Sequence, residues 1–297
     1  MGRSRTKSGA TPPGGSLPPP STGPTSGVVR AARALPPEAD DPPTSTREAT
    51  TDKRRPGRRV RVSPNACLER ALGAKTPSVR VRWARAGLAG GPCDLDTQAM
   101  LLRQLYLGEL ELGEYRRARL AAEQIVALGV MPDVAHHDAG RACQALEDAE
   151  GALDHMREAA RVCPAERRSF HLSTLGALLY AYGRPAEATA VLEEALRTPD
   201  VAAPLLRAQL ALARLRAEND AAGIEVAFHE LLHDRAGEGY GRFVLGELAV
   251  ARGDRRSAQL FLEAFLAKAK RARMASQAAL KPEIDRATEL LGRLVWN

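Results

Sequence analysis

Two histidines four residues apart, with a glutamate directly after the first, form the pattern His-Glu-x-x-His in Phe228–Asp234, FHELLHD. In zinc peptidases such a pair shares one face of a helix and holds the metal, while the glutamate acts on a metal-bound water. The pattern therefore makes zinc hydrolysis a candidate activity. A third protein ligand is also needed, and the extended motif is absent because Ala236 and Gly239 stand where its glycine and last histidine would be.

The apolar residues around the motif indicate which way its histidines point. At helical spacing Ile224, Phe228 and Leu231 gather on one side of the segment. His229 and His233 lie roughly 130° and 170° from the centre of that side. We therefore predict that both histidines face solvent. Such a pair can bind Zn²⁺ or Ni²⁺ adventitiously, but an outward surface excludes no water from a reaction.

The elements that carry the motif belong to the second part of a chain whose composition changes along its length. Twelve of the 20 prolines lie in residues 1–66, and residues 1–99 hold 17 Lys and Arg against 8 Asp and Glu, whereas residues 100–297 hold 26 against 28. A Pro, Gly and Ser-rich segment buries too little apolar surface to offset the entropy of ordering. We predict a disordered basic tail over residues 1–62.

The densest basic stretch of that tail, Arg54–Val62 (RRPGRRVRV), suggests one alternative function. It would attract nucleic acid or another acidic surface without specificity. The other interpretation is a solvated charged run with no dedicated partner.

Targeting and redox signals are few. The first 30 residues lack a continuous apolar core, and no stretch of about 18 apolar residues could span a membrane. Cys67, Cys93, Cys143 and Cys163 form no Cys-x-x-Cys pair. We expect a cytoplasmic protein with reduced cysteines, no cofactor and no membrane span.

From about residue 99 the sequence is helical in pattern and repeats itself. Long Ala, Leu, Arg and Glu stretches are broken at regular intervals. Equivalent turn residues stand 34, 36, 36 and 34 residues apart, at Gly113, Glu147, Gly183, Asn219 and Gly253. Gly or Asn suits the left-handed position that ends a helix. The unit is a pair of antiparallel helices, and about five units over residues 93–267 predict an all-α solenoid.

Small and large apolar residues alternate within each unit, most clearly in the third. Its first helix has Leu172, Leu175, Gly176 and Leu179, and its second has Ala188, Leu192, Ala195 and Leu196, closed by Pro199. The pattern resembles the tetratricopeptide repeat (TPR) family, W-x2-L-G-x2-Y, then A-x3-F, then P. The resemblance implies a right-handed superhelix that acts as a non-enzymatic protein-interaction module, an adaptor or assembly factor.

Two flanking segments complete the predicted architecture. Residues 63–92 resemble a degenerate leading hairpin, in which Ser63 caps the first helix and Pro64 occupies its first turn. Residues 268–297 are predicted to form a C-terminal capping helix that begins at Pro282.

The resemblance also implies where a partner binds, because first helices of the family line a concave groove that holds a peptide. The set of facing residues mixes basic, neutral and aromatic groups and lacks the Lys/Asn-rich clamp that some members use for carboxylates. Carried over by register, these residues are Arg103, His137, Arg141, Gln144, Ser173, Tyr180, Gln209, Arg216, Tyr240, Phe243 and Glu247. His136 and His137, beside Asp138, are expected to be exposed polar residues at the start of a helix.

Overall fold

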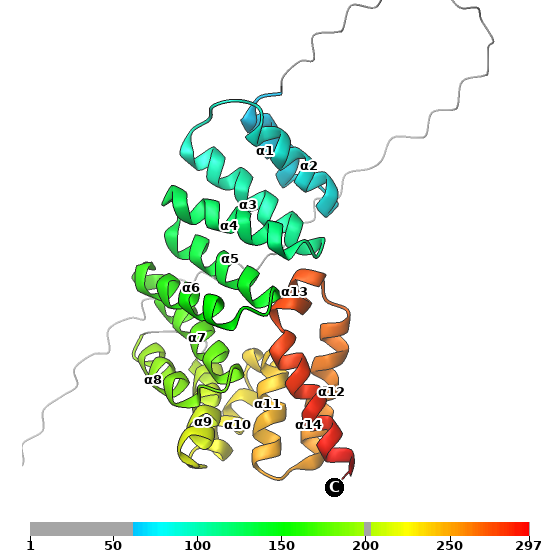
Figure 1. The fold of residues 1–297 in the computed structure, drawn as a ribbon. Coiled ribbons are helices and arrows are strands. Elements are labelled where there is room, and N and C mark those ends of the chain that lie inside the picture. The colour runs from blue at the N-terminus through cyan, green and yellow to red at the C-terminus, as the bar shows by residue number, and fades with distance from the viewer. Residues whose placement is uncertain (1–61, 199–202, 297) are drawn as a thin grey trace, which may run out of the picture. The chain divides into compact units, whose positions relative to one another are not determined.

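The computed structural model describes residues 62–198 and 203–296, and within these ranges every regular element is a helix (Figure 1). This confirms the predicted all-α class. The helices are α1 (Pro64–Leu72), α2 (Pro77–Leu88), α3 (Leu95–Glu111), α4 (Tyr115–Leu128), α5 (Pro132–Ala145), α6 (Ala149–Val162), α7 (Ala165–Ala181), α8 (Pro185–Leu196), α9 (Ala203–Glu218), α10 (Ile224–Leu232), α11 (Gly241–Ala251), α12 (Arg255–Lys270), α13 (Met274–Ala279) and α14 (Lys281–Trp296), with a 3₁₀ helix at Arg235–Gly237.

Consecutive helices from α3 to α12 pack as five pairs, and each pair packs on the next. The five predicted turn residues all have positive φ, 76° at Gly113, 59° at Glu147, 74° at Gly183, 55° at Asn219 and 73° at Gly253. Glycine reaches this left-handed region without steric cost, whereas a residue with a side chain is held there by its surroundings. The predicted repeat period is confirmed at every turn.

Glycines inside the pairs allow close approach of their two helices. A Cβ placed on Gly176 of α7 would lie 2.6 Å from Leu192 Cγ of α8. One placed on Gly246 of α11 would lie 2.5 Å from Leu262 Cδ2 of α12. Both leucines are fully buried, so the missing side chain is what lets them fill the seam.

The leading hairpin begins as its sequence predicts. Ser63 caps α1, because its hydroxyl accepts a hydrogen bond from the backbone N–H of Ala66 at 3.3 Å, and Pro64 is the first helical residue. Thr76 caps α2 in the same way. The predicted disordered tail lies, except for Val62, outside the described residues.

The last two helices, called here the C-terminal segment (α13 and α14), return along the stack. The sequence predicted one helix in this region. α14 packs on α12 and α11, whereas α13 contacts α3 and α5 of the first two pairs (Figure 1). Lys281 Nζ lies 3.6 Å from Glu147 Oε1, at the turn of the second pair. The segment therefore joins the last pair to the first two.

Across the described ranges, every helix is too short or too polar to cross a membrane.

Candidate functional site

The His-Glu-x-x-His motif spans the end of α10: His229 lies on the exposed face of the helix and His233 directly follows its last residue. His229 Nε2 is 2.9 Å from Glu225 Oε1, and His233 Nδ1 donates to the carbonyl oxygen of His229 at 2.8 Å. Glu230 forms an ion pair with Arg207 at 2.6 Å. The predicted outward orientation of both histidines is confirmed. In the ranges that the structure covers, no cluster of three or more His, Cys, Asp or Glu side chains is arranged to hold a metal ion.

Polar side chains connect the first helices of neighbouring pairs. Each contact joins residues 31 to 38 positions apart, about one repeat, so the same face of the stack carries all of them. The contacts are Arg103 Nε to Asp138 Oδ2 at 3.0 Å, His171 Nε2 to Asp133 Oδ2 at 3.1 Å, Ser173 Oγ to Gln209 Oε1 at 3.4 Å, Gln209 Nε2 to Tyr240 Oη at 3.4 Å and Arg216 Nη2 to Glu247 Oε1 at 2.9 Å.

A cavity of about 440 Å³, called here the groove cavity, lies between these first helices and the C-terminal segment. Five of the predicted groove residues line it: Arg141, Gln144, Ser173, Gln209 and Tyr240. The remaining lining residues were not predicted, and they are Phe170, Thr174, Ala177, Leu178, Leu205, Ala279, Leu280 and Glu283. The structure thus brings part of the predicted set together around one space.

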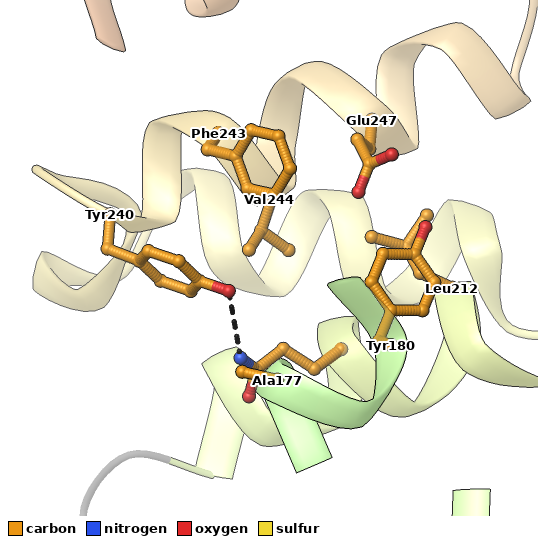
Figure 2. A pocket seen from close by; sticks show the side chains of 8 residues that line it. Ala177, Tyr180, Leu212, Tyr240, Phe243, Val244 and Glu247 are labelled. Atoms are coloured by element: carbon orange, nitrogen blue, oxygen red, sulfur yellow. Dashed lines mark hydrogen bonds between the residues drawn. The ribbon is translucent and has the colours of Figure 1, made fainter. Parts of the chain in front are cut away.

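Tyr240 forms the deep wall of this region. Its hydroxyl accepts the hydrogen bond from Gln209, and burial raises the pKa of the phenol, so Tyr240 stays protonated at neutral pH. Figure 2 shows Tyr240, Tyr180 and Phe243 converging on a second, much smaller pocket of about 10 Å³. That space holds no more than one water molecule.

The other six predicted groove residues make contacts within the protein itself. Phe243 is only 3% exposed and packs on the ring of Phe265, with 5.4 Å between ring centroids, so it belongs to the core. Glu247 is 4% exposed and pairs with Arg216 and Arg286. The assignment of these residues to an open groove is corrected, because α12 and α14 cover the face of α11. Arg103, His137, Tyr180 and Arg216 are likewise engaged by neighbouring side chains.

His137 corrects a second expectation, that His136 and His137 are exposed. Its ring lies 5.3 Å from that of Phe170 and 5.7 Å from that of His171, measured between centroids. Its Nδ1 is buried and has no hydrogen-bond partner among the described residues. Burial, with the nearby charge of Arg141, lowers the pKa of His137 to about 3, so the ring is neutral.

Glu283 is the functional candidate that sequence reasoning missed. Its side chain faces the groove cavity from the first turn of α14 and is 7% exposed, and its Oε2 has no hydrogen-bond partner among the described residues. Burial raises its pKa to about 7, although Arg141 acts in the opposite direction. A signal was present: Glu283 stands four residues before Ala287 on the buried stripe of α14, where an apolar residue is expected.

The paired helices, their period and their left-handed turns define a helical repeat protein with the tetratricopeptide repeat fold. No family model matches the chain, and neither does any curated protein. Among solved structures, PilF of Pseudomonas aeruginosa superposes with a TM-score of 0.50 at 18% identity, over 72% of this chain and 95% of that one. YrrB, a TPR protein with an unusual peptide-binding site, gives a TM-score of 0.38 at 16% identity, over 61% and 91%. The similarity to PilF supports the fold alone.

Proposed function

We propose that this protein is a non-enzymatic interaction module, an adaptor or assembly factor, which binds a segment of a partner protein in the groove cavity. The observation that carries the proposal is the cavity itself. Its volume of about 440 Å³ lies within the range of specific ligand sites, and it stands on the face where the first helices of neighbouring pairs meet.

The lining has the mixture of groups that peptide recognition uses. Phe170 is 54% exposed, and together with the partly buried Leu205 it offers apolar surface to a partner side chain. Gln144 and Gln209 carry both a donor and an acceptor, which suits the backbone of an extended segment. Apolar anchors with a few fixed polar groups are typical of binding interfaces.

Rigid elements hold these groups in place. Gln209 of α9 is fixed by two hydrogen bonds, one from Ser173 of α7 and one to Tyr240, which directly precedes α11. A site held in this way loses little conformational entropy when a ligand arrives, which favours binding.

The test is selection of peptides from a random displayed library on the full-length protein, followed by affinity measurements on synthetic copies. Phe170→Ala should weaken these peptides by about tenfold or more, because it removes the largest exposed apolar group of the cavity. Leu260→Ala is the matched control, since Leu260 is 63% exposed on α12, away from the cavity. A library that gives no binder, or peptides that bind both variants equally, would contradict the proposal.

A second comparison separates the groove from the basic tail. Deleting residues 1–61 should leave the affinity of the selected peptides unchanged at 0.15 M salt. Binding that disappears with the tail and falls steeply with salt would instead favour the nucleic-acid or acidic-surface alternative.

A further inference from the structure

We propose that the groove cavity recognises a lysine or arginine side chain of the bound segment, with Glu283 as its counter-charge. This inference rests on the proposed function and specifies the chemistry of the partner.

The argument begins with the incomplete bonding of Glu283. A carboxyl group that is 7% exposed has lost most of its hydration, yet its Oε2 has no partner among the described residues. Such a group is costly unless a donor satisfies it. Because Glu283 lines the groove cavity, a donor can reach it from that space.

The charge of the partner that Glu283 lacks follows from a comparison with Arg141, the other charged residue that lines the groove cavity. Arg141 also lines the space and acts electrostatically on Glu283, but it forms no ion pair with any described residue. Arg141 is only partly buried and remains hydrated, whereas Glu283 is not. An acidic ligand would satisfy Arg141 and leave the buried carboxyl beside a second negative charge. A basic ligand instead pairs with Glu283, which has lost more of its hydration than Arg141 and therefore gains more from an ion pair.

The remaining lining fits the stem of such a side chain. Phe170, Leu205 and Leu280 supply apolar surface beside the carboxyl. Lysine and arginine carry three or four methylenes before the charged head, and these pack on apolar surface while the head reaches a polar partner. The amide of Gln144, which also lines the cavity, carries a donor and an acceptor for the partner backbone.

The protonation of Glu283 gives an independent signature. Burial holds the pKa of the Glu283 carboxyl at about 7 in the free protein; the charge of Glu247 also raises this pKa and that of Arg141 lowers it. Arg216 and Arg286 line a neighbouring pocket with Glu283. A cation placed beside it lowers that pKa, so binding at pH 7 should release protons. Calorimetry in two buffers of different ionisation enthalpy measures that release.

The experiment uses the full-length protein and four pools of heptapeptides, random except for a central lysine, arginine, norleucine or glutamate. The lysine and arginine pools should bind about tenfold more tightly than the norleucine pool. Glu283→Gln should remove most of that preference and the proton release. Glu263→Gln makes the same change at an exposed position of α12 and should retain both.

Each outcome bears on a different claim. Equal binding of the lysine and norleucine pools, or preference for glutamate, would overturn the recognition by Glu283. If Phe170→Ala still weakened the binding of those pools, the proposed binding in the groove cavity would stand and only the specificity for a basic side chain would fail. If no pool bound, or if Phe170→Ala made no difference, the proposed function and this inference would both fail.

Discussion

Arg286 on α14 donates a hydrogen bond to Glu247 on α11, with 3.2 Å between Arg286 Nε and Glu247 Oε1. The same oxygen accepts from Arg216 of α9 at 2.9 Å. The side chain of Glu247 is 3% exposed and each arginine side chain is 30% exposed. One buried carboxylate therefore connects α9, α11 and α14, and it anchors the C-terminal segment to the last two pairs.

Removing that carboxylate should destabilise the protein measurably. Glu247→Ala leaves the partly buried Arg216 without its ion-pair partner and Arg286 with only the exposed Glu289, and we expect the free energy of unfolding to fall by about 2–3 kcal/mol. The midpoint of urea denaturation checks this. Glu289→Ala is the control, because Glu289 also pairs with Arg286 but at an exposed position, and its midpoint should barely move. Equal shifts in the two variants would show that burial of Glu247 has no energetic consequence.

Gly176 should not tolerate a methyl group. In Gly176→Ala the new Cβ lies 2.6 Å from Leu192 Cγ, so the seam between α7 and α8 must open, at a cost of about 1–3 kcal/mol. Gly292→Ala is a matched change on α14 with no atom within 4 Å, and it should be neutral or stabilising by up to about 1 kcal/mol. Thermal denaturation of both variants tests the difference. A Gly176→Ala protein as stable as the parent would refute the close approach.

Glu283 should make stability fall as pH rises. Its folded pKa of about 7 lies above the ordinary value of 4.5, so the folded state holds the proton more tightly than the unfolded state. The contribution of Glu283 to stability is therefore fully present below pH 4.5 and is lost progressively as pH rises through 7. Glu283→Gln should be about 2 kcal/mol more stable than the parent at pH 8 and little different at pH 4. Urea midpoints at the two pH values measure this, and a gain of the same size at both would exclude the titration as its cause.

His137 should act in the opposite direction. Its folded pKa of about 3 lies below the ordinary 6.5, so between these values the unfolded state binds the proton and the folded state does not. The contribution of His137 to stability is fully present above pH 6.5. It declines as pH falls toward 3, by up to about 1 kcal/mol per pH unit. Arg141, His171 and Arg103 face the ring and oppose its charging.

His137→Leu should reduce this loss of stability at acid pH, because leucine takes no proton. His233→Gln changes an exposed histidine and should leave the fall of stability at acid pH unchanged. Denaturation midpoints at several pH values from 4 to 7 compare the variants. An unchanged slope in His137→Leu would assign the acid sensitivity to other groups.

Local sequence patterns were sufficient to predict the repeat and the direction of the histidine motif. Gly113, Gly183 and Gly253 mark turns because their left-handed conformation depends on their own lack of a side chain. The outward position of His229 and His233 follows from helical geometry and from the buried residues of the same turn. These properties are decided within one or two helices, so the sequence carries them directly.

The proposed binding face was only partly predictable, because its content depends on residues more than a hundred positions away. A repeat register indicates which residues of α5, α7 and α11 face inward, but not that α14 would cover Glu247 or that α13 would reach α3. Glu283 was missed for the same reason. Its position in the helix is local information, whereas the electrostatic influence of Arg141 on Glu283 depends on the tertiary arrangement.

The return of α13 to α3 and α5 also changes how such a stack responds to stress. In an open array each repeat touches only its neighbours, so the ends fray independently and unfolding spreads one unit at a time. Here α13 contacts α3 and α5, so release of α13 should remove support from the first two pairs as well. We therefore expect the last pair and the first two pairs to lose their structure in the same cooperative transition.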